Sequence, residues 1–374
     1  MKVEVAPIPC ADFELLRSES MDRALLMSMC IAVGQRERLR AFDVQANGHS
    51  VGRFIGVREP FRYDVHFGPL TLFKWRTQRL RIIGEYGVVG RSGADLLATA
   101  IAELVLREHS VTLQAIPSDS PLYEAARSLR QLSAVHVRPF YPDAARHRLV
   151  TGGDFETYLK GLSKSTRQTF RQTLRKLHEN HAVELRVYER PQDVEEFVGR
   201  AATVARTTYQ QKRLGLGFTD AEGVARRVRL AAENGWLRSF VLFCDGAPAA
   251  YVEGYQGGGR WFTFQIGHDP KWSALSLGTA CQLEVLRYLM ESADRPRIID
   301  YLEGDMDYKR RLCNVHVMET TIEVTERASS VSLLPRAQGI LDGAYRCVRA
   351  LLIFLGWKRK RRSGARASRK GGSG

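Results

Sequence analysis

Apolar positions in the first half of the chain follow a helical period in some segments and a strand period in others. Residues 21–34 (MDRALLMSMCIAVG) and 93–109 (GADLLATAIAELVLREH) repeat apolar side chains at helical spacing, so both are predicted to be helices. Residues 38–59 are predicted to form a hairpin that turns at Asn47–Gly48, and residues 111–119 a short strand. The first half therefore predicts mixed α/β structure, without a motif of recognisable chemistry.

The second half begins with a helical pattern that has one basic and one apolar side, within residues 151–177. Its basic positions are Lys160, Lys164, Arg167, Arg171 and Arg175, and its apolar positions are Leu159, Leu162, Phe170, Leu174 and Leu177. A strand-like segment over residues 183–189 follows, and then two further helical patterns over residues 193–212 and 220–234.

The pattern changes to strands over residues 236–269. Three antiparallel strands are predicted there, with a tight turn at Asp245–Gly246 and a looser one over residues 257–259. A loop over residues 270–279 leads into a helix over residues 280–292. A strand over residues 297–303 and a last strand over residues 316–326 complete the pattern.

The C-terminal segment combines an apolar helix with a basic tail. The unbroken apolar run 350–357 is too short to span a bilayer. Two interpretations remain open for residues 339–370. The helix either lies in a membrane interface, with the tail attracted to anionic lipid, or it docks on the core and leaves a solvated tail.

Composition narrows the class of protein. The 374 residues suit two domains, and 44% apolar with 26% charged residues predict a soluble, globular protein. Residues 358–374 carry eight cations and no acid, so the rest of the chain accounts for less than half of the net charge of +15. This mildly basic body suits a polyanionic cofactor or a nucleic acid.

Other function classes lack their sequence signatures. The six cysteines are scattered singly, without C-x-x-C or metal-ligand spacing, so most are expected to be buried thiols and no metal site is expected. No helix-turn-helix or zinc-finger pattern favours DNA binding. Acidic residues near the start replace the basic region of a signal peptide, which predicts a cytoplasmic protein, peripheral at the inner face of the plasma membrane if the C-terminal segment binds lipid.

Two short stretches carry the candidate chemistry. Ser276–Leu277–Gly278–Thr279 stands at a predicted helix start, where free N–H groups and the helix dipole favour an anion, although a plain N-cap by Ser276 or Thr279 is an alternative. The second stretch, residues 300–312 (DYLEGDMDYKRRL), packs four carboxylates, two tyrosines and three consecutive cations behind a predicted strand.

Together with the three-stranded meander, these stretches resemble the GNAT superfamily of N-acetyltransferases. Within it, the chain is similar to the branch that unites cellulose- and exopolysaccharide-associated (CelD-like) acetyltransferases with Fem-type peptidyltransferases. The pattern G-x-D-P…S-P-G-T is matched by Gly267, Asp269, Pro270, Ser276, Gly278 and Thr279. The pattern D-F-x-x-G-D-x-x-Y-K is matched by Asp300, Gly304, Asp305, Tyr308 and Lys309. Residues 162–177 resemble the entry helix of the branch. Leu277, Tyr301 and Leu312 depart from its patterns.

The resemblance implies an α/β (α+β) GNAT fold, with a mixed and largely antiparallel sheet between helices, and two tandem GNAT-like lobes. It covers about residues 150–325. The expected segments are an N-terminal, degenerate lobe over 1–148, an acyltransferase lobe over 149–327, a C-terminal helix over 328–357 and a disordered basic tail over 358–374.

The resemblance also implies the donor and its site. Acetyl-CoA or a longer acyl-CoA is the expected donor. The expected donor-binding residues are Gln265, Ser276, Leu277, Gly278, Thr279 and Lys309, and the expected acceptor-binding residues are Arg167, His268, Tyr301 and Glu303. The acceptor would be an amine or hydroxyl of a sugar, polysaccharide or cell-envelope precursor.

Transfer from a thioester to an amine requires a base for the amine proton and an acid for the thiolate. Tyr308 is the candidate acid, and Glu253 and Asp305 are the candidate bases. Each carboxylate also has a structural interpretation: Glu253 as an outward-facing strand residue, and Asp305 as part of a turn that caps the next helix. No nucleophile–base pair is evident, so direct transfer is expected.

Two other functions remain open. The donor is aminoacyl-tRNA in Fem-type enzymes, and the basic helix 160–176 would then contact RNA, although the chain lacks their long coiled-coil arm. Alternatively, the GNAT lobe is inactive and the basic tail tethers a binding protein to membrane or nucleic acid.

Overall fold

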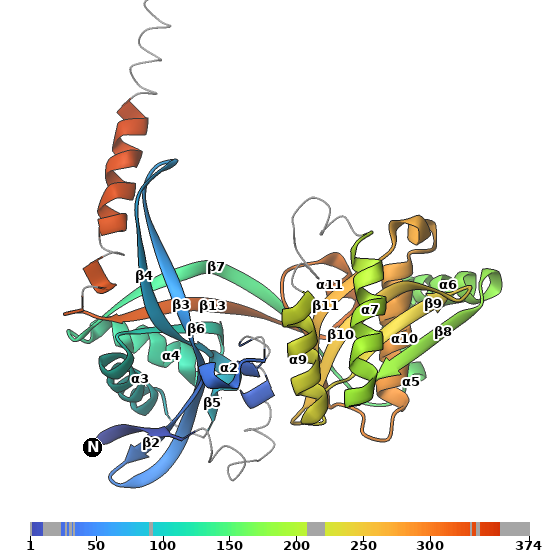
Figure 1. The fold of residues 1–374 in the computed structure, drawn as a ribbon, viewed down its shortest axis with the longest axis horizontal. Coiled ribbons are helices and arrows are strands. Elements are labelled where there is room, and N and C mark those ends of the chain that lie inside the picture. Colours follow the sequence, from blue (N-terminus) through green and yellow to red (C-terminus); the bar gives the residue numbers. More distant parts are fainter. Residues whose placement is uncertain are drawn as a thin grey trace, which may run out of the picture.

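The computed structural model describes residues 2–9, 24–26, 28–29, 32, 34–89, 93–207, 221–329, 331–333 and 337–351. Within these residues, strands from both halves of the chain form one continuous sheet (Figure 1). In spatial order the strands are β1 (Val3–Ile8), β2 (Leu39–Ala46), β3 (His49–Phe67), β4 (Leu70–Ile83), β6 (Ser110–Pro117), β13 (Val315–Glu326), β7 (Val135–Val150), β12 (Ile298–Glu303), β11 (Arg260–His268), β10 (Ala247–Gly257), β9 (Ser239–Cys244) and β8 (Val183–Tyr188). The short strand β5 (Val88–Val89) pairs with β3.

The two halves repeat one topology. In each half, an antiparallel run of strands ends in a parallel pair, β4 with β6 in the first half and β11 with β12 in the second. A long helix connects the two strands of each pair, α3 (Ala94–Glu108) in the first half and α10 (Leu277–Glu291) in the second. Even a rare backbone conformation is repeated, since Ala115 of β6 and Leu302 of β12 both have positive φ, 57° and 56°. The chain is therefore a tandem repeat of one α/β unit.

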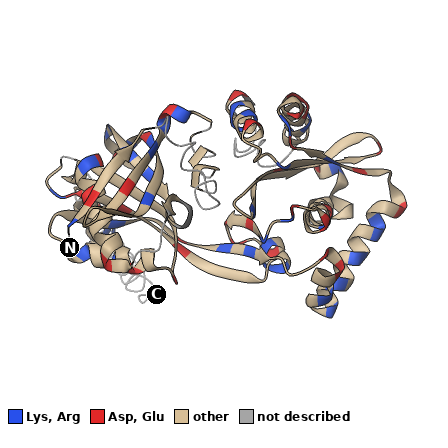
Figure 2. Ribbon diagram, turned by 90° about the horizontal axis from the view of Figure 1, so that it is seen from below, with Lys and Arg blue, Asp and Glu red and all other residues tan. Residues whose placement is uncertain are grey.

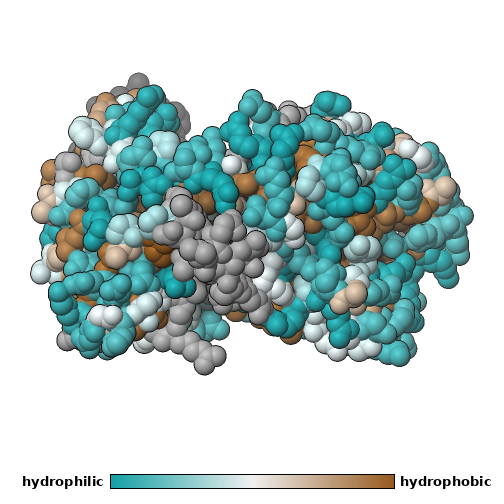
Figure 3. Space-filling view, turned by 60° about the horizontal axis from the view of Figure 1, so that its bottom comes forward, coloured by the Kyte–Doolittle hydropathy of each residue, from teal (hydrophilic) through white to brown (hydrophobic). Residues whose placement is uncertain are grey.

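The two halves exchange a strand. The last strand of the first half, β7, lies between β12 and β13 of the second half, while β13 lies between β6 and β7. Each half thus completes its sheet with a strand from the other. In the space-filling view the halves form two lobes with a mostly hydrophilic surface (Figure 3).

A buried charge cluster fixes this exchange. Arg146 of β7 is 2% exposed and donates to Asp300 of β12, at 2.9 and 3.0 Å, and to Glu319 of β13, at 3.1 and 3.2 Å. Arg148 lies within 3.5 Å of Asp300 and 3.3 Å of Glu319. Two arginines thus neutralise two buried carboxylates, which prevents an isolated charge in the sheet.

Helices cover both faces of the second half. α5 (Phe155–Gly161), α6 (Lys164–Asn180) and α10 pack on one face, where apolar residues of α10 such as Leu283 and Leu286 are fully buried. α7 (Val194–Ala205) and α9 (Ala221–Glu233) pack on the other face. In the first half, α3 and α4 (Pro121–Ser128) bury a separate core. The mixed, largely antiparallel sheet with flanking helices confirms the fold class that the sequence predicts.

The predicted turns are confirmed by backbone geometry. Asn47–Gly48 and Asp245–Gly246 have positive φ at both residues, as a tight hairpin turn requires, and Gly258 and Gly259 form the looser turn. Of the predicted C-terminal helix 328–357, residues 331–333 and 337–351 are helical and residues 328–329 are not. Residues 352–357 and the basic tail 358–374 lie outside the described residues. None of the described helices is long and apolar enough to cross a membrane.

Candidate active site

The parallel pair β11 and β12 separates partway along its length. The strands pair at only three positions, Arg260 with Ile298, Trp261 with Ile299 and Phe262 with Asp300. The rest of β11, as far as His268, pairs with β10, and a bulge opposite Glu253 and Gly254 marks the change. The two strand ends therefore diverge and open the sheet toward the start of α10.

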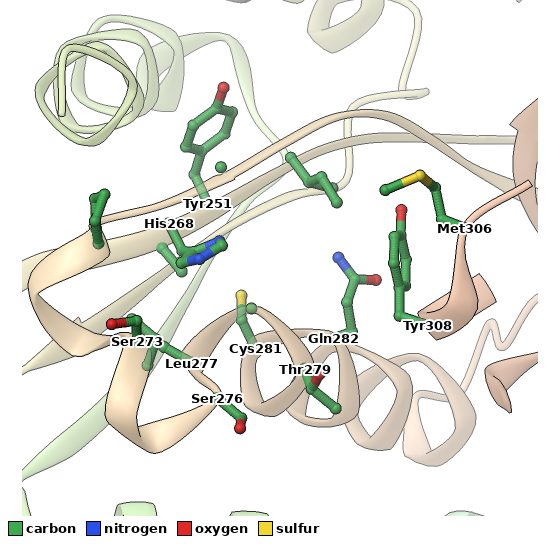
Figure 4. A pocket seen from close by; sticks show the side chains of 15 residues that line it. Tyr251, His268, Ser273, Ser276, Leu277, Thr279, Cys281, Gln282, Met306 and Tyr308 are labelled. Carbon is green, nitrogen blue, oxygen red and sulfur yellow. The ribbon is translucent and has the colours of Figure 1, made fainter. Parts of the chain in front are cut away.

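A cavity of about 560 Å³ lies at this opening. β10 and β11 contribute Tyr251, Ile266 and His268, the start of α10 contributes its first two turns, and the segment around α11 (Asp307–Leu312) contributes Met306 and Tyr308 (Figure 4). The cavity therefore joins the divergent strands to a helix N-terminus, which suits a long ligand with an anionic end.

The first turn of α10 lines the cavity. Ser276 has left-handed geometry (φ 52°, ψ 40°), and its carbonyl accepts from the N–H groups of Thr279 and Ala280. Its hydroxyl makes no capping hydrogen bond, so an ordinary side-chain N-cap does not explain this residue. Leu277 is fully buried and anchors the first turn, where an α-helix leaves N–H groups without intrahelical acceptors.

Gly278 lies against the ring of His268. A Cβ atom at position 278 would stand 3.1 Å from Nδ1 and 3.3 Å from Cε1 of that histidine, closer than most side-chain contacts. Glycine therefore allows the imidazole to pack on the helix start. Partial burial lowers the pKa of His268 from its ordinary value, so the ring is neutral at pH 7.

Tyr308 forms the opposite end of the cavity. Burial, followed by the nearby Cys313 thiol, raises the pKa of Tyr308 to about 12, so its hydroxyl remains protonated in the neutral range. The edge of its ring meets Tyr301, with ring centroids 6.2 Å apart. Between the two ends lies Gln282, which is 2% exposed and whose Oε1 has no hydrogen-bond partner among the described residues (Figure 4). This buried amide oxygen is available to accept a hydrogen bond from a polar ligand or from water in the cavity.

The ammonium group of Lys309, an expected donor-binding residue, contacts the end of β12. Its ammonium group donates to the carbonyls of Tyr301 at 2.7 Å and Glu303 at 2.6 Å, and its side chain is buried. Burial lowers its pKa. Leu302 and Gly304, with φ of 56° and 106°, kink the strand end that these bonds hold. Lys309 therefore fixes the wall of the site and is not among the residues that line the cavity.

Glu253 is fully buried but does not line the cavity. Its carboxylate accepts from Arg227 of α9, at 2.8 Å from Nε and 3.1 Å from Nη2, and from the hydroxyl of Tyr255. Gln265 pairs with it across the two strands, and Oε1 of Gln265 is buried without a partner in the described part of the chain. Glu253 and Gln265 therefore lie in the sheet beside the cavity, where Glu253 contacts α9, and neither residue lines the cavity.

The other predicted residues surround the cavity without lining it. Asp305 is half exposed and bonds to Nε2 of His147 at 3.2 Å. Tyr301 is buried, and burial raises its pKa well above the ordinary value. The Glu303 side chain is exposed at the end of β12, and Arg167 donates to the carbonyl of Lys160 at 3.0 Å.

The structure thus brings six predicted residues to the cavity: His268, Ser276, Leu277, Gly278, Thr279 and Tyr308. Sequence reasoning missed Tyr251, Ile266, Cys281, Gln282 and Met306. The signal for Gln282 was available, because it is a lone amide among apolar residues one turn after Gly278. No cluster of possible metal ligands occurs among the residues that the structure describes.

The divergent parallel strands, and the helix that begins at their opening, are features of a GNAT fold. The two halves of the chain form two lobes with this topology. Residues 164–310 match the family described as acetyltransferase (GNAT) domain. The matched segment contains the divergent strands, α10 and Tyr308. No curated protein matches the sequence.

Solved structures support the fold over nearly the whole chain. FemX superposes with a TM-score of 0.59 at 9% identity, over 86% of this chain and 96% of that one. A conserved protein of unknown function from Bacteroides thetaiotaomicron VPI-5482 gives 0.54 at 13% identity, over 87% and 100%. The C-terminal domain of a putative lysylphosphatidylglycerol synthetase from Agrobacterium fabrum gives 0.51 at 10% identity, over 90% and 94%.

Proposed function

We propose that this protein is an acyltransferase that moves an acyl group from acyl-CoA directly to an amine or hydroxyl. The observation that carries the proposal is the cavity between the divergent strands β11 and β12, which ends at the first turn of α10. A long thioester with a pyrophosphate group has the shape and charge that this opening suits.

The donor would bind along the opening. The pyrophosphate would accept from N–H groups at the first turn of α10, where the helix dipole favours negative charge. The pantetheine arm would then follow the edge of β11 beyond Phe262, which β12 leaves free. The unsatisfied amide oxygen of Gln282 would accept from an amide N–H of this arm.

The reaction needs few protein groups. A neutral amine attacks the thioester carbonyl carbon, a C–N bond forms and the C–S bond breaks. The nitrogen is cationic after the attack. The thiolate takes a proton from the Tyr308 hydroxyl, and the resulting phenolate recovers, through water, the extra proton of this cationic nitrogen, which leaves a neutral amide. Glu253 and Asp305 would receive that proton only through water, since neither lines the cavity. We therefore assign Glu253 a structural role through Arg227, and leave Tyr308 as the acid.

The contacts of α6 favour acyl-CoA over aminoacyl-tRNA as donor. Its exposed cations form a basic stripe (Figure 2). However, Arg171 pairs with Glu156 at 2.6 Å, Arg175 lies 3.7 Å from Glu179, and Arg167 donates to a backbone carbonyl. These cations already have partners within the chain, which weakens the case for an RNA surface. For the acceptor we propose an amino sugar or another polysaccharide or envelope precursor, on the motif resemblance of residues 267–279 and 300–309.

Calorimetric titration with acetyl-CoA and longer acyl-CoA tests the donor. We expect micromolar binding, about −8 kcal/mol. Thr279→Glu places a carboxylate beside the expected pyrophosphate, so it should weaken binding at least about tenfold by charge repulsion. The matched control is Thr99→Glu, at an exposed position of α3 in the other lobe, and it should bind as the unaltered protein does.

The outcomes separate the candidate donors. Binding that Thr279→Glu weakens and Thr99→Glu does not would support the proposed site. If no acyl-CoA binds, the proposal fails, and transfer from aminoacyl-tRNA to a peptide or lipid acceptor becomes the reaction to assay. If neither donor is used, an inactive binding lobe remains.

A further inference from the structure

A long hairpin and the C-terminal helix project together from the first lobe. β3 and β4 extend beyond the rest of the sheet, and helix 337–351 lies beside them (Figure 1). The His66 N–H donates to Oε1 of Gln338 at 2.7 Å, and the rings of Phe67 and Tyr345 meet edge to face at 5.6 Å. Tyr63 and Val65 pack against Leu341. We call residues 70–76 and 337–351 the hairpin–helix surface.

The hairpin half of this surface is apolar and exposed. Every residue from 70 to 76 is exposed, although four of the seven have large apolar side chains. Leu70 is 63% exposed, Leu72 55%, and Phe73 and Trp75 44% each. Side chains of this size are normally buried, so a cluster of four in one strand indicates an interaction surface.

The helix half carries a second apolar stripe that the protein does not cover. The stripe that packs on the hairpin contains Leu341 and Tyr345. A different stripe, at i, i+4, i+7, i+8 and i+11 from residue 340, faces solvent: Ile340, Ala344, Cys347, Val348 and Leu351. Ile340 is 73% exposed and Leu351 56%. The sequence continues this apolar character through 352–357, beyond the described residues.

The charges of the surface are predominantly positive. Lys74 and Arg76 alternate with the apolar residues of β4, and Arg346 and Arg349 lie on the polar side of the helix. The one acid of the helix segment, Asp342, already accepts from Gln338 at 2.6 Å. Residues 358–374, which follow this helix in sequence, add eight cations and no acid.

We propose that the hairpin–helix surface docks on an anionic lipid membrane. Exposed Leu, Phe and Trp side chains beside cations are the pattern of elements that lie in a membrane interface, where apolar groups enter the acyl boundary and cations meet anionic headgroups. The charge argues against a second copy of the chain as the occupant, because two such surfaces would bring like charges together. The surface is separate from the acyl-transfer cavity, so this inference does not depend on the proposed reaction.

Vesicle sedimentation of the full-length protein tests the proposal. The probes are phosphatidylcholine vesicles with and without about a third of phosphatidylglycerol. The variant Phe73→Glu/Ile340→Glu changes one exposed residue on each half of the surface and keeps the basic tail. Leu106→Glu/Leu132→Glu is the control, because these residues are 43% and 37% exposed elsewhere on the first lobe and the charge change is the same.

We expect the protein and the control to bind the anionic vesicles, and more weakly at high salt. The variant should bind at least about tenfold more weakly, because two apolar side chains no longer enter the bilayer. Equal binding of variant and control would overturn the proposal and show that the basic tail alone attracts the protein to anionic vesicles. Light scattering that shows a dimer without lipid, and a monomer for the variant, would also overturn it and identify a subunit interface. Circular dichroism verifies that both double variants fold.

Discussion

At the scale of single residues, Tyr308 is the side chain on which the proposed chemistry depends. Tyr308→Phe should lower kcat by about 10²-fold or more, because the thiolate loses its proton donor, and leave the KM for acyl-CoA nearly unchanged. Since the pKa of Tyr308 is raised to about 12, the unaltered enzyme should show no loss of kcat from acid deprotonation between about pH 7 and pH 10. Steady-state assays with an amino-sugar acceptor measure both.

Tyr141→Phe is the control for this substitution, since Tyr141 is 55% exposed in the first lobe. It should have the kcat of the unaltered enzyme. If Tyr308→Phe retains full kcat in the same assay, then Tyr308 is only part of the cavity wall and the proton comes from another group.

Glu253 gives a second prediction at this scale. Glu253→Gln removes the charge that neutralises Arg227, which is buried, so the free energy of unfolding should fall by about 3–5 kcal/mol. Glu195→Gln is the control, because the Glu195 pair with Arg229 is exposed and should contribute less than about 1 kcal/mol. Urea denaturation measures both. A Glu253→Gln protein of unchanged stability that has lost kcat would identify Glu253 as the base.

The sequence singled out part of the cavity lining. Ser276–Thr279 and Tyr308 line the cavity, and they could be singled out because a helix start after a strand and a tyrosine after the next strand are local features. Lys309 stands next to Tyr308 in sequence, yet its ammonium group turns toward the carbonyls of its own strand. The direction of a side chain on a short helix depends on what packs against it, which spacing does not reveal.

At the scale of elements, β7 is the strand that connects the lobes, and its two faces have different chemistry. Arg146 and Arg148 contact carboxylates of the neighbouring strands, while His147 faces the start of α11. The hydrogen-bond partners of His147 indicate which of its nitrogens carries the proton. A carboxylate only accepts, so His147 donates through Nε2 to Asp305. In a neutral His147 the Nδ1 then accepts, so His316 donates to it through its own Nδ1, at 2.7 Å.

This arrangement predicts an acid sensitivity of stability. Burial lowers the pKa of His147, a shift that Asp305 opposes and that His316 and Lys309 reinforce. The unfolded chain therefore binds this proton more readily, and the free energy of unfolding should fall as the pH drops below about 6.5. His147→Gln should reduce this fall in urea denaturation curves recorded near pH 7 and near pH 5. An unchanged pH dependence would show that other groups cause it.

Local signals explain which elements the sequence predicted. The turns at Asn47–Gly48 and Asp245–Gly246 depend on two adjacent residues, and both were found. β7 was not predicted, because Pro139 and charged residues interrupt its pattern and its partners in β12 and β13 lie about 150 residues or more later in the chain. Pro139 sits beside register irregularities in the pairing with β13, where a missing N–H is tolerated.

At the scale of the whole molecule, the exchange of β7 and β13 makes the lobes interdependent. Residues 151–374 produced alone should not fold, because β12 and β13 would lose β7, and Asp300 and Glu319 would lose Arg146. Co-production with residues 1–150 should restore soluble protein, because the missing strand can then pair. Soluble yield and circular dichroism measure this. A fragment 151–374 that folds and binds acyl-CoA without its counterpart would contradict it.

The same exchange has a consequence for synthesis on the ribosome. The strand slot between β6 and β7 is filled by residues 315–326, which are translated after almost all of the rest of the chain. Until then the nascent first lobe exposes unpaired edges on β6 and β7, which invite wrong pairing between neighbouring chains. Native pairing in the first lobe is therefore delayed until residues 315–326 have left the ribosome, and chaperones that cover strand edges would protect the chain during this delay.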